Sequence, residues 1–328
     1  LVAQPHWKSE DFDLPDDEAM NRVMRNYAYP PGDSGEALIP DFIARAHHRN
    51  VKVLLSIQGS AQGQFVPVAR DDRKRALFAR VMAAFVRKYG YDGIEIDWEH
   101  TIDIVQHARL MADLRHALSA AAEAEGRGPQ TYYLTTALNT CHAYPPELAQ
   151  RLCSSVDWVN LMTYDMGGGN WGSVPLHNTP LDKMQEAMTK WAVFPPHKIC
   201  IGLANYGYRY KGLFPGQKSE TSLKVNGRSI SFKELQTLVE SGWTESYAAA
   251  AEAPYYFSPD KTEFVTIDSE RSLSRKMEWV FQMKYRGVFW WEFHHDYFPP
   301  DSDHTQARHP LIDSVSNAIF DFGQKHAR

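Results

Sequence analysis

The chain has 328 residues, of which 43% are hydrophobic and 12% aromatic, so it is long enough to bury a large core. Its 40 acidic residues outnumber its 35 lysines and arginines, and the resulting net charge of −5 gives no signature of polyanion binding, so we expect no nucleic-acid partner. No apolar run approaches the length of a membrane span, so we expect no membrane contact.

Cys141, Cys153 and Cys200 show neither paired spacing nor a CxxC motif. We interpret them as buried thiols, although this spacing does not exclude one disulfide. The chain begins at Leu1 rather than at Met, which indicates a processed or trimmed form whose export signal is out of view. We expect a secreted or periplasmic protein that is a monomer.

Short apolar runs alternate with amphipathic segments along the whole chain. The runs that predict strands are residues 2–7, 23–29, 51–57, 93–98, 132–138, 156–163, 199–205 and 287–291. Segments with apolar residues at three- and four-residue spacing predict helices at residues 73–87, 104–122, 181–191 and 272–283. Strands alternating with helices in this way predict an α/β fold, a (β/α)8 barrel that forms one domain over residues 1–328.

Two features qualify this prediction. Pro5 and the polar residues 11–17 fit the first two strands poorly. A doubly wound open sheet is the competing fold, but the glycine-containing turn after residues 51–57 does not open a helix, as a phosphate-binding turn would. The barrel is therefore favoured.

The gap between the last two predicted strands is about eighty residues, roughly twice the usual spacing here. Within it, residues 225–231 contain an Asn-Gly turn signal, residues 232–240 have a helical pattern, and residues 254–267 have the pattern of a hairpin. We expect a small α+β insertion over residues 212–268, in the last loop at the mouth of the barrel.

The segment YDGIEIDWEH, residues 91–100, places acids where a buried strand normally has packing groups. Alternate strand residues share a face, so Glu95, Asp97 and Glu99 lie on one side. The other side carries Ile94, Ile96 and Trp98. Asp92 has the parity of this second side, where a structural role is expected.

Neighbouring carboxylates in this row are about 6.8 Å apart. At an effective dielectric constant of about 20, each ionised pair costs on the order of 2 kcal/mol, so at least one group should keep its proton near neutral pH. Glu99 comes last, nearest the rim where barrel sites lie, and is the natural general acid.

A hard-cation site and a solvated edge strand are the alternative interpretations of this acidic row. Catalysis is favoured because cation sites draw ligands from loops and because the flanking residues indicate burial.

The sequence DGIEIDWE resembles the DGxDxDxE signature of glycoside hydrolase family 18, the chitinase family. Other segments resemble this family in the same order: NYAYP, VKVLLSIQGS, VDWVNLMTYDMGGGNWG, KICIGLANYGYRY and RGVFWWEFHHD. The resemblance covers nearly the whole chain, and the expected insertion corresponds to one found in a subgroup of the family.

The resemblance implies a retaining, substrate-assisted reaction. Glu99 would protonate the glycosidic oxygen while the substrate's own acetamido carbonyl attacks the anomeric carbon and forms an oxazolinium ion. Asp97 would orient the acetamido group and share a proton with Glu95. Tyr164 would donate a hydrogen bond to the acetamido oxygen, and Asp165 would hold the distorted sugar. This chemistry requires no protein nucleophile, so we expect no cofactor and no metal.

Two tryptophans are expected to contact sugar rings. By the resemblance, Trp291 would form the hydrophobic floor of the subsite, with core packing as its alternative. Trp171 would stack on the leaving side, with a role as a loop anchor nearly as well supported. The packing alternative for Tyr164 and Asp165 is that they cap a helix or turn.

Four more residues are candidates for the substrate site. For Tyr206 and Tyr29 the sequence does not decide between the cleft and the core. Met162 is expected to pack beneath the site. Ser56 would either donate a hydrogen bond within the carboxylate row or have only a structural role in its strand.

The chain departs from the family pattern at several positions. Glu95 stands where the family usually has Asp, Gln58 replaces the first glycine of the SxGG motif, and Tyr208 stands where many chitinases have Arg. The segment HWKSED, residues 6–11, resembles the first strand of the family only weakly.

We expect the partner to be chitin or N-acetylglucosamine oligosaccharides, cleaved at β-1,4 bonds. The alternatives are hydrolysis of peptidoglycan or of the N-glycan core, which uses the same acetamido chemistry, and a non-catalytic chitin-binding lectin. The presence of Glu99 disfavours a lectin, but Glu95, which departs from the family's usual aspartate, leaves the lectin as an alternative.

Overall fold

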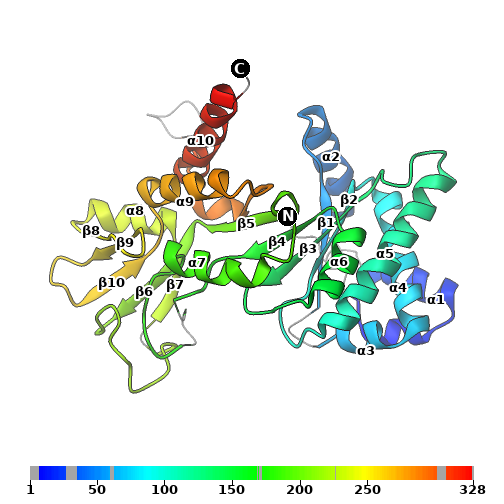
Figure 1. Cartoon of the computed structure of the whole chain (residues 1–328), viewed down its shortest axis with the longest axis horizontal. Helices are drawn as coiled ribbons and strands as arrows, with labels where there is room; N and C mark the ends of the chain where they lie inside the picture. The colour runs from blue at the N-terminus through cyan, green and yellow to red at the C-terminus, as the bar shows by residue number, and fades with distance from the viewer. Residues whose placement is uncertain are drawn as a thin grey trace. The chain divides into compact units, whose positions relative to one another are not determined.

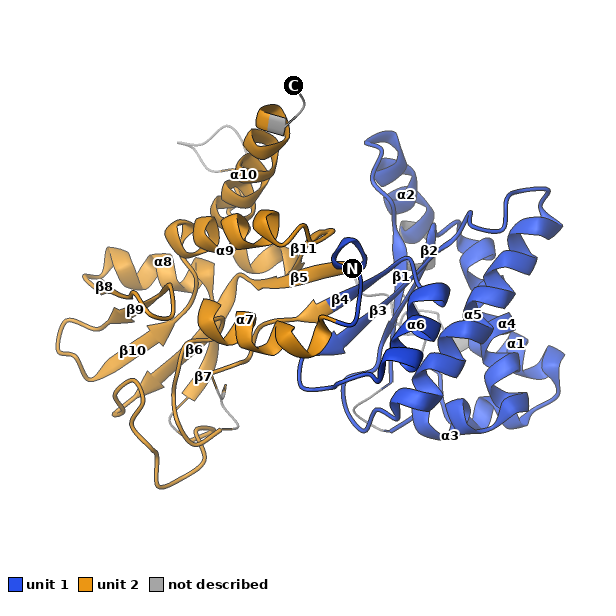
Figure 2. Ribbon diagram, in the orientation of Figure 1, with its two compact units in different colours: residues 1–160, 193–198 blue, residues 161–192, 199–328 orange. Residues whose placement is uncertain are grey.

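The computed structural model describes residues 7–26, 35–59, 63–167, 169, 172–225, 227–300 and 308–326. The chain divides into two compact units, coloured separately in Figure 2. Unit 1 comprises Leu1–Asn160 and Val193–Lys198, and unit 2 comprises Leu161–Ala192 and Ile199–Arg328. The first boundary lies inside strand β4 (Trp158–Met162).

Unit 1 contains a parallel sheet in which the strands follow chain order (Figure 1). Its strands are β1 (Leu54–Gln58), β2 (Gly93–Asp97), β3 (Tyr133–Asn139) and the first residues of β4. The strands approach closely at Gly93, where a Cβ atom would lie 2.1 Å from the carbonyl oxygen of Tyr133. Glycine at this position therefore allows β2 and β3 to pair in the observed register.

Helices connect these strands, as the amphipathic pattern predicts. The helices of unit 1 are η1 (Ser9–Asp13), α1 (Asp16–Asn26), α2 (Gly35–His48), α3 (Phe65–Arg70), α4 (Asp72–Tyr89), α5 (Ile104–Ala124), α6 (Pro146–Ser155) and η3 (Pro196–Lys198). Helix α4 begins where the Asp71 side chain accepts a hydrogen bond from Lys74 N–H, and it ends at Gly90, which adopts φ 77°. Such local signals explain why the helix bounds lie close to those predicted.

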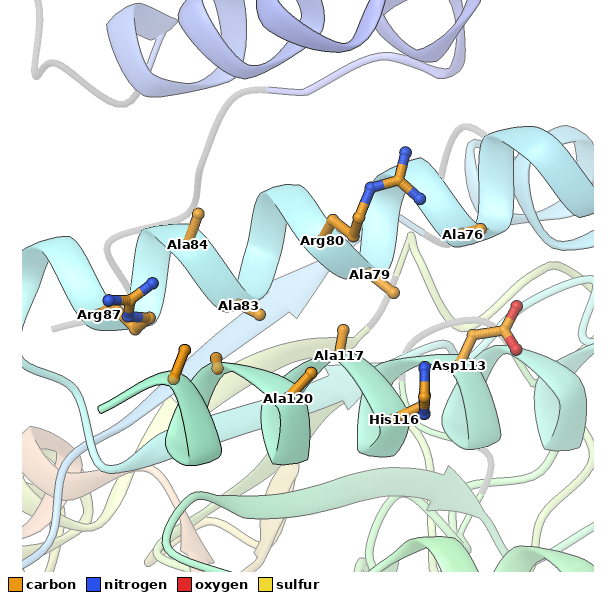
Figure 3. A pocket seen from close by; sticks show the side chains of 12 residues that line it. Ala76, Ala79, Arg80, Ala83, Ala84, Arg87, Asp113, His116, Ala117 and Ala120 are labelled. Atoms are coloured by element: carbon orange, nitrogen blue, oxygen red, sulfur yellow. The ribbon is translucent and has the colours of Figure 1, made fainter. Parts of the chain in front are cut away.

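Small side chains line a groove of about 430 Å³ between α4 and α5 (Figure 3). Eight alanines form most of its lining. Its one carboxylate, Asp113, accepts a hydrogen bond from Arg75 Nε at 2.7 Å. The groove is therefore a consequence of alanine-rich helix packing.

Unit 2 contains two groups of strands. Strand β5 (Ile199–Ala204) pairs in parallel with β11 (Gly287–Trp291), and the last residues of β4 lie on the other side of β5. The second group is an antiparallel sheet with the order β7-β6-β10-β9-β8. Its strands are β6 (Tyr206–Lys211), β7 (Gly227–Ser231), β8 (Thr244–Ala248), β9 (Ala253–Phe257) and β10 (Glu263–Thr266).

The helices of unit 2 are α7 (Leu181–Met188), η2 (Thr189–Trp191), α8 (Phe232–Glu240), α9 (Glu270–Gln282), η4 (Phe293–Asp296) and α10 (Pro310–His326). Helices α9 and α10 pack together through Phe281 and Phe322, whose ring centroids are 4.0 Å apart. No helix in the described ranges is both long and apolar enough to span a membrane. No disulfide joins the three cysteines, all of which are described. Cys200 is buried as predicted and Cys153 is partly buried, but the prediction of a buried thiol is wrong for Cys141, which is exposed.

Six of the eight predicted strands are confirmed as β1 to β5 and β11. The strand predicted at residues 23–29 is wrong in its described part, because residues 23–26 belong to α1. Residues 2–6 and 27–29 lie outside the described residues, and Trp7 is not in a strand. The helix at 232–240 and the hairpin at 254–267 are confirmed. The assignment of one domain with an insertion at 212–268 stays a prediction, and the antiparallel sheet itself begins at Tyr206.

Candidate active site

The acidic row on β2 has the alternation that its sequence predicts. Ile94, Ile96 and Trp98 are fully buried on one face, where Trp98 stacks on Phe65 with ring centroids 5.2 Å apart. The carboxylates of Glu95 and Asp97 belong to the other face, and Glu99 follows the carboxyl end of the strand. The apolar face thus anchors the strand in the core while the acids remain available for chemistry.

Glu95 contacts a polar side chain on each of three strands. The Asn160 amide donates a hydrogen bond to its Oε2, and the Thr135 hydroxyl donates to the same oxygen at 3.2 Å. Ser56 donates to Oε1 at 3.4 Å, a long and weak bond. Burial raises the pKa of Glu95 despite these three donors, which act in the opposite direction.

Asp97 lies beside it and is only 7% exposed. The Gln58 amide donates to its Oδ2 at 2.8 Å, while Oδ1 is buried and has no hydrogen-bond partner among the described residues. Burial, followed by the negative charge of Glu99, raises the pKa of Asp97 to about 7, and the hydrogen bond from Gln58 opposes this shift. Asp97 is therefore close to half-protonated at neutral pH.

Glu99 is half-buried, and its charge acts directly on Asp97. Like charges this close disfavour the ionised form of Asp97. A row of coupled carboxyls at the carboxyl end of a parallel strand can supply and take back a proton.

Asp92 is separate from this row, as parity predicts. Its carboxylate accepts hydrogen bonds from His47 at 2.7 Å, from Lys52 Nζ at 3.1 Å and from Val53 N–H at 2.8 Å. These hydrogen bonds connect the start of β2 to the segment before β1, so the structural role predicted for Asp92 is confirmed.

A second polar group lies in unit 2 around Asp165. This residue has a left-handed backbone, φ 60°, which aspartate tolerates better than most residues. The side-chain oxygen Oδ1 of Asn178 accepts a hydrogen bond from the Asp165 backbone N–H at 2.8 Å. The hydroxyls of Tyr206 and Tyr208 donate to the same carboxylate oxygen of Asp165 at 2.7 and 2.6 Å. Burial raises the pKa of Asp165, and the two tyrosines act against that shift.

Tyr164 belongs to the same group, with its ring centroid 6.1 Å from that of Tyr206. Its position requires a glycine on β5, because a Cβ atom at Gly202 would lie 2.9 Å from the Tyr164 ring. Met162, at the end of β4, is buried, which agrees with a packing role.

Trp291 ends β11 and is 39% exposed, so its indole is available to a ligand. The peptide bond that follows it, to Glu292, is cis. The Asn205 side chain accepts the Glu292 N–H at 2.9 Å and donates to the Glu292 carbonyl. Asn205 therefore fixes the backbone directly after the exposed indole.

The predicted site residues therefore fall into two groups. In unit 1 the structure brings together Ser56, Glu95, Asp97 and Glu99. In unit 2 it brings together Tyr164, Asp165 and Tyr206, and it places Met162 and Trp291 at strand ends. Tyr29 and Trp171 lie outside the described residues.

Sequence reasoning missed several hydrogen-bond donors of these groups. Asn160, Thr135 and Asn178 were not predicted at all, and Gln58 and Tyr208 were noted only as departures from a motif. The parallel register could have indicated two of them, because Gln58 is opposite Asp97 and Thr135 is opposite Glu95. No comparable signal was available for Asn178, which reaches Asp165 through a loop.

Comparison with known proteins shows the same fold in solved structures. A GH18 chitinase from Cycas revoluta, solved in complexes with allosamidin and with (GlcNAc)3, has a TM-score of 0.73 and 23% identity over 88% of this chain and 87% of that one. A chitinase-like agglutinin from Robinia pseudoacacia has a TM-score of 0.71 and 21% identity over 87% of both chains. These similarities confirm the predicted (β/α)8-barrel class.

Sequence comparison agrees with this result. Chitinase A1 of Niallia circulans is 25% identical over 290 residues, which are 75% of this chain and 41% of that protein. The chain thus spans less than half the length of this relative. The family model described as glycosyl hydrolases family 18 matches residues 24–296, so the chain belongs to glycosyl hydrolases family 18.

Proposed function

We propose that this chain is a chitinase-like glycosidase that cleaves β-1,4 bonds after N-acetylglucosamine units. The observation that carries the proposal is the carboxylate row, in which Asp97 has a pKa of about 7 beside Glu99. Coupled carboxyls that hold a proton near neutral pH suit a reaction that needs an acid first and a base later. Relatives named chitinase and endochitinase support the substrate class.

The unit 1 residues supply the proton chemistry in this proposal. Glu99 protonates the glycosidic oxygen, and the substrate's acetamido carbonyl attacks the anomeric carbon to give an oxazolinium ion. Asp97 orients the acetamido group and balances the positive charge on its nitrogen. Water then attacks the anomeric carbon and breaks its bond to the acetamido oxygen while Glu99 takes a proton from the water. The two displacements together retain the anomeric configuration.

The family motifs imply sugar-binding roles for the unit 2 residues in this proposal. Tyr164 donates a hydrogen bond to the acetamido oxygen, and Asp165 holds the distorted ring. The two tyrosine hydroxyls on Asp165 support this role, since they keep its carboxylate in one orientation. Trp291 presents its exposed indole as an apolar platform for the sugar face.

A lectin is the second candidate, because the Robinia agglutinin has this fold. Hydrolysis of peptidoglycan or of the N-glycan core is an alternative within the same chemistry. The secreted or periplasmic location and the monomeric state stay predictions.

One panel of substrates separates these functions. The purified chain is incubated with fluorogenic chitobiose and chitotriose, with muropeptides and with an N-glycosylated protein, and turnover and binding are both measured. We expect turnover of the chitin oligomers, with a β-configured product as the first product seen by NMR. Binding of chitin oligomers with no turnover would contradict the proposal of an enzyme and support a lectin. Turnover of only the muropeptides or of only the N-glycosylated protein would contradict the proposed substrate and support the corresponding alternative.

A further inference from the structure

Glu292, His294 and His295 form a cluster at the carboxyl end of β11 that the proposed reaction does not use. One ligand atom from each side chain lies within 4.8 Å of the others. The Glu292 Oε1 atom is 2.9 Å from His294 Nε2 and 3.2 Å from His295 Nε2. Two imidazoles therefore point at one carboxylate oxygen, which is an arrangement that a cation can occupy.

We propose that these three residues bind a divalent transition-metal ion of the zinc class. Two imidazoles and one carboxylate are a common donor set for Zn²⁺, with a fourth position left for water or another oxygen. In a tetrahedral zinc site, with bonds of about 2.0–2.1 Å, ligand atoms lie roughly 3.3 Å apart. The observed carboxylate-to-nitrogen distances are within a few tenths of an ångström of this spacing.

The backbone geometry explains how three residues so close in sequence converge. Glu292 is the N-cap of the 3-10 helix η4, in which side chains three residues apart lie on the same face. Glu292 and His295 have this spacing. His294 reaches the same carboxylate from the adjacent position, as its distance to Glu292 shows.

Both ends of this short segment are held in place. Asn205 fixes the backbone of Glu292 at its start. At its end, buried Asp296 accepts the N–H groups of Leu311 and Ile312 at 2.9 and 3.0 Å, which ties η4 to the start of α10. A site on restrained backbone loses less conformational entropy when it binds an ion, which favours affinity.

The surroundings favour a cation that can arrive from solvent. The His294 side chain is 73% exposed, so the cluster is accessible. Glu234 on α8 adds a second negative charge near enough to act on His295. The donors also select the metal, because imidazole suits zinc-class ions whereas Mg²⁺ and Ca²⁺ prefer oxygen ligands.

This site is independent of the proposed function, which requires no metal. Its position still matters, since Glu292 directly follows Trp291. A bound ion would restrain the backbone next to the exposed indole.

Metal binding by the full chain tests the proposal without reference to activity. The protein is freed of metal with a chelator and titrated with Zn²⁺ or Mg²⁺ by calorimetry, for the wild type and for Glu292→Gln, His294→Ala and His116→Ala. The last variant is the control, because His116 is an exposed histidine on α5 outside the cluster. Thermal unfolding is recorded with and without Zn²⁺.

We expect one Zn²⁺ per wild-type chain and no comparable binding of Mg²⁺. Glu292→Gln and His294→Ala should each weaken Zn²⁺ binding at least about tenfold, since even outer-shell partners of a metal are worth that much, and His116→Ala should not. Zn²⁺ should raise the unfolding temperature of the wild type and of the control only. Equal Zn²⁺ binding by the wild type and His294→Ala, or no Zn²⁺ binding by the wild type, would overturn the proposal.

Discussion

At the scale of single residues, the unusual Glu95 gains contacts on three neighbouring strands. Its carboxylate receives hydrogen bonds from Ser56 on β1, Thr135 on β3 and Asn160 on β4. The family usually has aspartate at this position, and the additional methylene extends the glutamate further from its own backbone. We infer that Glu95 forms a hydrogen-bonded support beneath Asp97 and still contributes a charge that raises the pKa of Asp97.

The amide of Asn160 should stabilise the ionised form of Glu95. Asn160→Ala removes a donor that lowers the pKa of this buried carboxyl, so its pKa should rise further. We expect a loss of about 1–3 kcal/mol in the free energy of unfolding at pH values above the raised pKa of Glu95, where this carboxyl is ionised. The loss should be smaller at low pH, where Glu95 is protonated in the folded and unfolded chains alike.

Denaturant unfolding at several pH values measures this effect, and Ser56→Ala is the matched control, because Ser56 donates to the same carboxylate over a long distance of 3.4 Å. The control should cost less than Asn160→Ala. Asn160 also accepts a hydrogen bond from Trp158 Nε1 at 3.0 Å, and losing that bond adds a cost that does not vary with pH. An Asn160→Ala cost that is the same at all pH values would contradict the role of the amide.

Asp97 predicts a characteristic dependence of stability on pH. Its pKa rises from an ordinary value of 3.8 to about 7 on folding, so the folded chain binds more protons between these values. The contribution of Asp97 to stability is therefore fully present below about pH 4 and is lost as pH rises through 7, by up to about 4 kcal/mol. Asp97→Asn should remove this decline, which urea unfolding from pH 4 to 8 can measure. The same slope in both proteins would show that Asp97 is not the titrating group.

At the scale of elements, β6 shows how alternation builds a polar function into a packed sheet. Tyr206, Tyr208 and Tyr210 alternate along the strand and share one buried face. The first two donate to Asp165, whereas Tyr210 donates to the Gly169 carbonyl at 2.8 Å. One strand therefore provides the apolar packing of the sheet and two hydrogen bonds to a predicted sugar-binding carboxylate.

Tyr208 and Tyr210 offer a matched pair of substitutions. Tyr208→Phe removes a hydrogen bond to Asp165, so the pKa of Asp165 should rise and kcat/KM on chitin oligomers should fall about tenfold or more. Tyr210→Phe removes a hydroxyl that bonds only to backbone in the described contacts, so kcat/KM should stay near the wild-type value. Equal losses in both variants would indicate a general packing effect instead.

Elements with strong local patterns could be predicted from the sequence. Six strands and the bounds of α8 were predicted because apolar runs and helical spacing mark them in the sequence. The capping box of Ser231 and Glu234 explains why α8 begins at Phe232. The strand predicted at residues 23–29 was wrong because Val23 was read as a strand former. Pro15 and the three acids in the first turn of α1 favour the start of a helix at this point. Val23 is buried, but it lies on a face of that helix and not in a strand.

The candidate site was predictable to a different degree. Alternation alone predicted that Glu95 and Asp97 share a face of β2, because a strand has only two faces. Family motifs indicated Tyr164 and Asp165. Donors such as Asn178 were not predictable, since they depend on how loops fold in three dimensions and not on a period in the sequence.

At the scale of the whole molecule, each unit has its own charged pair, which is partly buried in unit 1 and fully buried in unit 2. In unit 1, Arg115 donates to Asp157 at 2.6 Å and to the Tyr132 carbonyl at 2.8 Å. In unit 2, Lys276 is fully buried against Asp268, which also accepts a hydrogen bond from Thr179 at 2.7 Å. Such pairs fix the relative positions of helices and strands because an unpaired buried charge is costly.

The Lys276 pair should therefore be essential to the stability of unit 2. Lys276→Met leaves Asp268 buried without its cation, and we expect a loss of about 3–5 kcal/mol in the free energy of unfolding. The double variant Lys276→Met with Asp268→Asn removes both charges and should recover part of this loss. Chemical denaturation of the three proteins tests both statements. A double variant that is less stable than the single one would contradict the explanation by charge.

The central claim is that the whole chain is a hydrolase with Glu99 as its acid. The direct test compares turnover of fluorogenic chitotriose, and binding of an unlabelled chitin oligomer, in the wild type, Glu99→Gln and the exposed-surface control Glu123→Gln. We expect the wild type and the control to turn over the substrate. Glu99→Gln should lose at least about a hundredfold in kcat while still binding the oligomer, because a general acid contributes at least that much. No turnover by the wild type, or unchanged turnover by Glu99→Gln, would contradict the account.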